Sequence, residues 1–116
     1  MVNISVLKDF SRTPGPRYKE EGSFSGEEFR NNILLPKIKE AIIQKKTLLV
    51  DLDGVSGYGT SFLEEAFGGL IRVNDIDYKT LKNTLKLKSE EDDIYIEEIW
   101  EYIEDAKNKK DSNETI

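Results

Sequence analysis

Hydrophobic side chains mark a short central strand that is followed by an amphipathic helix. Residues 48–50 form a continuous apolar run, which is typical of a strand covered on both faces. Beyond a glycine-rich connection, apolar residues return at helical spacing and form one stripe: Phe62, Leu63, Ala66, Phe67, Leu70 and Ile71. Residues 47–73 therefore predict a strand, a sharp turn and a helix. Thr60 or Ser61 is expected to be the N-cap of that helix.

The N-terminal part of the chain predicts two further strands and another helix. Residues 3–10 alternate loosely between apolar and polar and suggest a first strand, while residues 17–21 suggest a short edge strand. Ser25 and Glu28 stand at the spacing of a capping box, so a helix is expected to begin there. Pro36 should kink this helix or break it just before the proline.

The C-terminal half predicts a short helix over residues 78–83, a last strand over residues 85–88 and a terminal helix. The terminal helix has an acidic face and an apolar face, formed by Ile96, Ile99, Trp100 and Ile103. Residues 107–116 lack apolar periodicity and are expected to form a frayed or disordered tail. The domain is therefore expected to span residues 1–106.

The alternation of strands and helices predicts an α/β fold. A central mixed, mostly parallel sheet of about four strands would be covered by helices, because strand-helix-strand crossovers make neighbouring strands parallel. A chain of 116 residues is the size of one ordinary domain.

Composition removes several classes of function. The chain has no cysteine and no histidine, which excludes disulfides, thiol catalysis, Ser-His-Asp triads and ordinary zinc sites. Carboxylates, lysines, tyrosines and hydroxyl groups remain as candidate catalytic groups. A net charge of −6, from 17 basic and 23 acidic residues, argues against a nucleic-acid surface. No apolar run approaches a membrane span or a signal sequence, so the expected location is the cytoplasm.

The glycine turn is the main candidate site. Gly54, Gly57 and Gly59 let the connection turn sharply and leave little side chain around Thr60. The first N–H groups of a helix are unpaired and partly positive, so a phosphate on Thr60 or Ser61 would be electrostatically favoured. The alternative is that these hydroxyls only cap the helix, a role that contributes about 1 kcal/mol.

Residues 47–73 resemble the signature of the STAS domain, which bacterial anti-anti-sigma factors share with the cytoplasmic tails of sulfate transporters. In that signature a V-D-L-S-G-V strand precedes a D-S-S-G-L turn and a helix. Residues 50–55, V-D-L-D-G-V, match the strand, and residues 59–63, G-T-S-F-L, occupy the turn. The whole chain resembles small bacterial STAS-like proteins of uncharacterised function, which carry similar S-G-E-E-F-R and G-Y-G-T-S-F-L-E-E-A-F-G-G-L-I-R segments. The resemblance implies a STAS-like sandwich.

The resemblance also implies a regulatory function. In the anti-anti-sigma factors, the first hydroxyl of the turn is phosphorylated by a partner kinase that is also the anti-sigma factor, and this hydroxyl corresponds to Thr60. The chain has Gly59 where the family has Asp, and Phe62 where it has Gly. The implied function is a non-enzymatic protein-interaction module, monomeric or homodimeric and without a metal or cofactor. It would bind a partner such as a histidine-kinase-like ATPase.

Charged residues around the turn affect this hypothesis. Glu64 and Glu65 suit the first turn of the helix but would repel a phosphate on Thr60 or Ser61 unless a cation is close. Arg12, Arg17 and Arg30 are the possible cations. The residues predicted to bind a partner or an anion are Gly57, Tyr58, Gly59, Glu64, Glu65, Arg17 and Arg30.

Two of these features have a structural alternative. Tyr58 is the aromatic residue most expected to be exposed and to anchor a partner, or else it folds back over the core. Gly68 and Gly69 interrupt an apolar helix, so something must approach that backbone closely. The close neighbour is either another helix of the same domain or a partner or second copy.

Two other functions stay open. The backbone amides of residues 57–61 could cradle a nucleotide or small anion, although the glycine spacing is not that of a P-loop and no lysine follows. Asp51 and Asp53 could bind Mg²⁺ in a carboxylate-dependent hydrolase if further ligands came from elsewhere. The alternative for the two aspartates is turn chemistry at the strand end.

Overall fold

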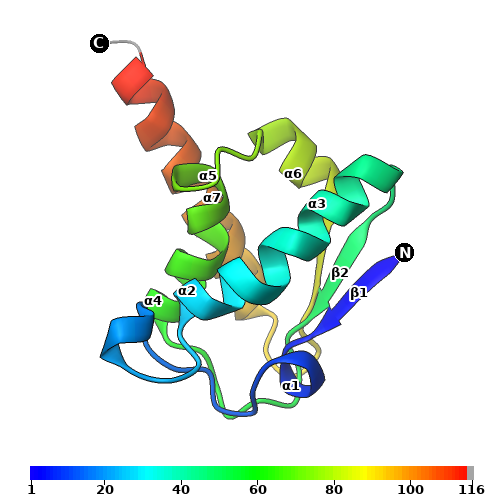
Figure 1. Ribbon diagram of the computed structural model, residues 1–116, viewed down its shortest axis with the longest axis vertical. Helices are drawn as coiled ribbons and strands as arrows, with labels where there is room; N and C mark the ends of the chain where they lie inside the picture. Colours follow the sequence, from blue (N-terminus) through cyan, green and yellow to red (C-terminus); the bar gives the residue numbers. More distant parts are fainter. Residues whose placement is uncertain (115–116) are drawn as a thin grey trace.

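The sheet has three parallel strands, and Figure 1 shows it on one side of the molecule, with α5 (Gly69–Arg72) and α7 (Ile94–Glu114) on the other. A computed structural model describes residues 1–114 and places β1 (Val2–Ser5), β2 (Leu48–Asp51) and β3 (Leu85–Lys88) in the order β1-β2-β3. The apolar run at residues 48–50 is therefore the middle strand. The predicted α/β class is confirmed, and the parallel arrangement follows from the helical crossovers that join the strands.

Helices and helical turns make up most of the remaining chain. They are α1 (Val6–Asp9), the 3₁₀ turn η1 (Lys19–Glu21), α2 (Gly26–Phe29), the π-helical turn η2 (Arg30–Leu34), α3 (Leu35–Gln44), α4 (Thr60–Leu63), the π-helical turn η3 (Glu64–Gly68), α5 (Gly69–Arg72), α6 (Tyr78–Thr84) and α7 (Ile94–Glu114). The segments α2-η2-α3 and α4-η3-α5 each run without a break, so each is one helix with a π-helical turn inside it.

One face of the sheet forms part of the core. Ile4, Leu48, Val50 and Leu85 are buried, whereas Leu49 on the opposite face of β2 is half-buried. α3 packs on β1 and β2, and the helix containing η3 and α5 packs against α7 on one side and α2 on the other. Figure 1 shows α3 lying across the front of the sheet and α5 beside α7. The helix that follows the glycine turn is thus packed between two other helices.

The number of strands differs from the prediction. The sheet within residues 1–114 has three strands and is wholly parallel, where about four strands in a mixed sheet were expected. Residues 17–21 contain the 3₁₀ turn η1 in place of an edge strand, because the Glu21 carboxylate accepts the backbone N–H of Tyr18 and bends the chain. The first strand also ends earlier, at Ser5, whose hydroxyl caps α1.

The predicted helix starts and breaks are largely observed. Ser25 is the N-cap of α2, and its hydroxyl accepts the N–H of Glu28 at 3.0 Å. Just before Pro36 the helix widens into η2, in which the N–H of Leu35 bonds to the carbonyl of Arg30. A π-helical turn accommodates the missing proline N–H without ending the helix.

The expected C-terminal tail is helical as far as Glu114, because α7 continues through residues 107–114. Side-chain contacts hold this part in place: Lys107 pairs with Asp111 at 2.9 Å and lies over the ring of Tyr78, and Lys110 pairs with Asp75. Residues 115–116 lie outside the described part of the chain. None of the helices in residues 1–114 combines the length and the apolar character that crossing a lipid bilayer requires.

Candidate functional site

The glycine turn ends in a helix whose start has no side-chain cap. Gly59 is the N-cap, with φ −78° and ψ 152°, and its carbonyl accepts the N–H of Leu63 at 3.2 Å. The prediction that Thr60 or Ser61 is the N-cap is therefore wrong. Both residues already have helical backbone geometry, and an N-cap residue must lie outside it.

Thr60 and Ser61 are exposed, and their hydroxyl groups have no hydrogen-bond partner among the described residues. Neither hydroxyl forms a hydrogen bond with any residue from 1 to 112, and no side chain among these residues bonds to the first amides of α4. The space next to Gly59 is also open, since a Cβ placed there would meet no atom within 4 Å. The end of the turn is thus a small polar surface that the rest of the domain leaves accessible.

Tyr58 points inward from the same turn. Its hydroxyl donates to the carbonyl of Leu52 at 2.7 Å, and its ring packs on Phe62 and Tyr95 with centroid distances of 6.0 and 5.1 Å. Burial raises the pKa of the half-buried Tyr58 hydroxyl. The expectation of an exposed anchor is wrong, and the alternative, that Tyr58 folds over the core, is observed.

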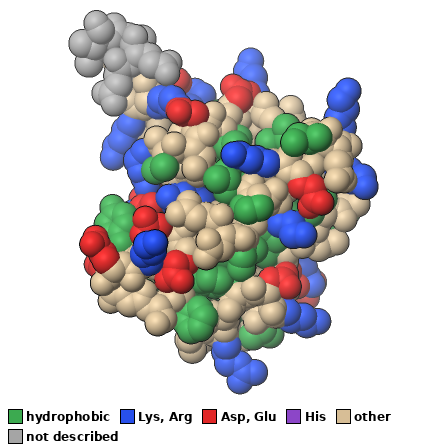
Figure 2. Space-filling view, viewed as in Figure 1, with side chains coloured by type: hydrophobic (Ala, Val, Ile, Leu, Met, Phe, Trp, Pro, Cys, Tyr) green, Lys and Arg blue, Asp and Glu red, His purple; other side chains and the backbone are tan. Residues whose placement is uncertain are grey.

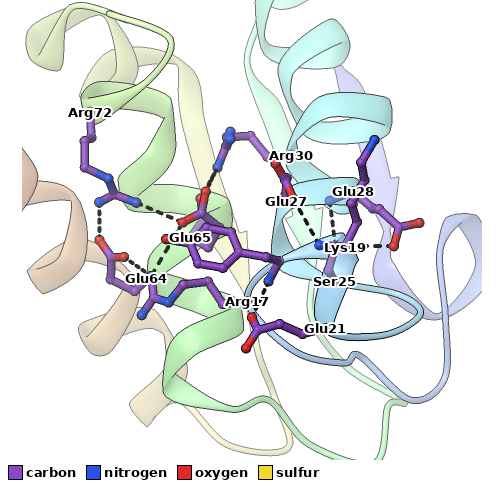
Figure 3. Close-up of polar contacts among 11 residues, drawn as sticks. Arg17, Lys19, Glu21, Ser25, Glu27, Glu28, Arg30, Glu64, Glu65 and Arg72 are labelled. Carbon is purple, nitrogen blue, oxygen red and sulfur yellow. Dashed lines mark hydrogen bonds and ion pairs between the residues drawn. The ribbon is translucent and has the colours of Figure 1, made fainter.

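One helical turn beyond Thr60, five charged residues form an ion-pair network (Figure 3). Its centre is Glu65, of which 4 % is exposed. Arg30 Nη1 lies 2.5 Å from Glu65 Oε2, Arg72 Nη2 lies 3.2 Å from Oε1, and Arg17 Nη1 lies 3.5 Å from Oε1. Guanidinium groups from three segments therefore converge on one buried carboxylate.

Glu64 completes the network nearer the surface. It accepts hydrogen bonds from Arg17 and from Arg72 Nη1, the latter at 2.5 Å. Burial alone would raise the pKa of Glu64, but the hydrogen bonds from Arg72 and Arg17 outweigh it and lower the pKa. Burial likewise acts to lower the pKa of Arg17, and the pairing with Glu64 and Glu65 raises it. Three arginines face two glutamates, which leaves one positive charge in excess. We call Arg17, Arg30, Glu64, Glu65 and Arg72 the arginine network.

Glycines and π-helical turns make room for this network. A Cβ on Gly69 would overlap the Arg30 guanidinium, and one on Gly68 would lie 2.6 Å from Glu64 Oε2 and 3.4 Å from the carbonyl of Tyr102 in α7. The close neighbours of Gly68 and Gly69 are thus parts of the same domain. Arg30 begins η2, and Glu64 and Glu65 begin η3. Such π-helical turns occur frequently at functional sites.

Two of the arginines that were predicted to lie near the phosphate contact the helix, but not at its start. Arg17 and Arg30 contact Glu64 and Glu65, and neither contacts Thr60 or Ser61. The side chain of Arg12 is exposed and makes none of these contacts. The sequence analysis missed Arg72. Its place two helical turns after Glu65 on the same helix was a usable signal for this pair.

The carboxylates of Asp51 and Asp53 accept hydrogen bonds from backbone amides of the neighbouring loops. Asp53 accepts the N–H groups of Glu90 and Glu91 at 2.9 and 3.0 Å. Although burial acts in the opposite direction, these two bonds lower the pKa of Asp53. Asp51 accepts the N–H of Asp53 at 3.0 Å. Within residues 1–114 no group of three or more acidic side chains is arranged to hold a metal ion.

Comparisons with known proteins find one family. The model of the family described as a STAS-like domain of unknown function (DUF4325) matches residues 25–95, which include the glycine turn and four members of the arginine network. No curated protein and no solved structure matches the chain.

Proposed function

The chain belongs to the STAS-like domain family of unknown function, and from this premise we propose that it is a non-enzymatic regulatory module that binds a protein partner. The contact surface is the end of the glycine turn, residues 57–61, with the helix that follows. Phosphorylation of Thr60 or Ser61 is the switch. The partner is an ATPase of the anti-sigma-factor type that carries the kinase activity, and both proteins act in the cytoplasm.

The proposal rests on one observation, namely that no side chain caps the start of α4. Hydroxyls that cap a helix are held by its amides and are poor targets for a kinase. Here Gly59 takes the N-cap position, and Thr60 and Ser61 are exposed without a hydrogen-bond partner among the described residues. The domain gains nothing structural from these two hydroxyls, which favours a role in contact with another molecule.

The arginine network supports the switch by neutralising the nearby acids. Glu64 and Glu65 lie one turn from the hydroxyls and on their own would repel a phosphate. Arg17, Arg30 and Arg72 pair with both carboxylates and leave an excess positive charge. A phosphate on Thr60 or Ser61 therefore meets no net negative charge from the arginine network as a whole.

The expected effect of phosphorylation is on the interface and not on the fold. A phosphate adds nearly two negative charges and three strong hydrogen-bond acceptors. The site is exposed and lies at the start of the helix, so the domain can stay folded while acids on the partner are repelled.

Capture of the partner by variants tests the proposal. Thr60→Glu and Ser61→Glu place negative charge at the turn and should abolish capture from a lysate of the native cells, whereas Thr60→Ala and Ser61→Ala should preserve it. Ser23→Glu is the matched control, because Ser23 is exposed in a different loop. Equal capture by all five variants would contradict the proposal.

The second candidate function is the binding of a nucleotide or small anion. The ligand would bind to the same uncapped backbone amides at the start of α4. The specific observation in its favour is that no side chain bonds to the first amides of α4. Thermal stabilisation by ATP or GTP in the wild type, and its absence in Thr60→Pro, would support this candidate over the protein-interaction module. The carboxylate-dependent hydrolase receives no such support, because Asp51 and Asp53 bond to backbone amides.

A further inference from the structure

A groove lies between the arginine network and α7. One cavity of about 260 Å³ and an adjoining one of about 430 Å³ share Glu64, Arg72, Asp105 and Lys109 in their walls. Lys110 extends the groove at one end, and Arg17 with Tyr18 extends it at the other. Figure 3 shows Arg17 and Arg72 reaching Glu64 from opposite sides, and α7 carries the far wall.

The charge of this groove opposes that of the whole chain. Its walls carry four basic side chains, Arg17, Arg72, Lys109 and Lys110, and two acidic ones, Glu64 and Asp105. The chain as a whole has a net charge of −6. Beneath the groove, Glu65 is already paired with the buried Arg30. Figure 2 shows basic side chains gathered on the side of the molecule near the C-terminal part of α7.

Several donors in the groove have no acceptor. The polar contacts of the Arg17 guanidinium with residues 1–112 are all made by Nη1, so Nη2 and Nε have no acceptor among these residues. Lys109 is exposed and pairs with none of the described carboxylates. A guanidinium fork and a mobile ammonium are the groups that bind phosphate oxygens in proteins.

Stability alone does not explain why such a network is kept. Burying ion pairs removes charges from water, and apolar residues of similar size often serve the fold as well or better. Arg30 even keeps a buried Nε without a partner. A rigid, pre-paired set of arginines does hold its outer members at the rim of the groove, where an anion can reach them.

We propose that this groove is a binding site for a small phosphate-bearing molecule, with Arg17, Arg72 and Lys109 as the groups that contact the phosphate. The three contacting residues lie outside the glycine turn: Arg17 just before η1, Arg72 in α5 and Lys109 in α7. Glu64 in the wall belongs to the helix that follows the turn. Tyr18, which is 42 % exposed at the end of the groove, offers an apolar face to the rest of the ligand. Asp105 opposes the anion and limits its affinity.

A titration with pyrophosphate, followed by ¹H–¹⁵N NMR of the full chain, tests the site. The expected result is saturable shifts at Arg17, Arg72, Asp105 and Lys109, which sodium chloride at matched ionic strength does not reproduce. Lys109→Gln should weaken binding by about fivefold or more, because a charge-assisted contact is lost. Asp105→Asn should tighten it, because the opposing charge is removed.

Lys86→Gln is the matched control, since Lys86 is exposed on β3 away from the groove. It removes the same charge from the chain and should leave the affinity for pyrophosphate unchanged. Absence of saturable shifts, shifts centred elsewhere, or equal effects of Lys86→Gln and Lys109→Gln would overturn the site. Adenosine serves as a probe without phosphate, and shifts as strong with adenosine as with pyrophosphate would also overturn it. Lys86 and Lys109 both lie outside residues 57–61, so pyrophosphate binding and partner capture are tested by different variants.

Discussion

Two successive turns of one helix differ in how their polar groups are used. At the start, Thr60 and Ser61 are exposed and form no hydrogen bond with the described residues. One turn later, Glu64 and Glu65 are held by three arginines from three segments. The fold depends on the second region and can do without the first.

This contrast separates residues that stabilise from residues that can act. Buried charges that pair with each other fix how η2, η3, α5 and the segment before η1 meet, because each must be satisfied within the domain. Exposed hydroxyl groups can bond to water and need no partner within the domain. Changes at the buried pair Arg30 and Glu65 should therefore alter stability, and changes at the turn should alter partner binding.

The largest expected effect is from Arg30→Ala. Arg30 is 3 % exposed and donates to both the carbonyl and the carboxylate of Glu65. Its loss leaves a buried carboxylate short of a partner and should lower the free energy of unfolding by about 3–5 kcal/mol, measured by urea denaturation. Arg12→Ala removes an exposed arginine and should change it by less than about 0.5 kcal/mol. Equal effects would contradict the assignment of the network as structural.

Gly69→Ala should have the next largest effect. The added methyl group would overlap the Arg30 guanidinium, and such overpacking lowers stability by about 1–3 kcal/mol. In an Arg30→Ala background the overlap is absent, and the same substitution should be neutral or stabilise by up to about 1 kcal/mol, as alanine does in helices. A double-mutant cycle from urea denaturation measures the difference. Additive effects would show that Gly69 does not make room for Arg30.

Acid should weaken the network through Glu64. Its folded pKa lies below the ordinary value of 4.5, so its contribution is complete above that value and is lost as the pH falls through the folded pKa. Stability measured by urea denaturation from neutral pH to below 4.5 should therefore fall toward acid. Glu64→Gln should be less stable at neutral pH and should have a shallower slope. A slope identical to that of the wild type would show that Glu64 contributes nothing to the acid dependence.

The smallest expected effects are at the turn. Gly59→Asp supplies the missing N-cap side chain and should raise stability by up to about 0.5 kcal/mol. Gly59→Ala supplies none and should lower it by about 0.5 kcal/mol, since alanine is a poorer N-cap than glycine. Melting temperatures of the two variants distinguish these signs. If both variants shift in the same direction, the start of α4 is not an uncapped helix end.

Local patterns in the sequence predicted most of the elements. The apolar run at residues 48–50, the N-cap at Ser25 and the helical stripe after the glycine turn each depend on neighbours within about four residues, and each is observed. The error at Thr60 arose because the cap can move by one residue when glycine precedes the hydroxyl. The edge strand at residues 17–21 was wrong because Glu21 bonds back to Tyr18.

The arginine network could be predicted only in part. Arg17, Arg30, Glu64 and Glu65 were named, but as groups near a phosphate, and their pairing spans 35 or more residues of sequence. Contacts between residues this far apart in the sequence depend on the packing of α2 on η3, which no local sequence pattern indicates. Gly68 and Gly69 did indicate a close approach, and the structure identifies the approaching groups as Arg30 and α7.

The most direct test of the central claim separates the protein of its native cells into partner-bound and free fractions and measures the intact mass of each. The account predicts an unmodified protein in the bound fraction and a form about 80 Da heavier, the mass of one phosphoryl group on Thr60 or Ser61, in the free fraction. The heavier form in the bound fraction, or an unmodified protein with no partner in either fraction, would contradict it.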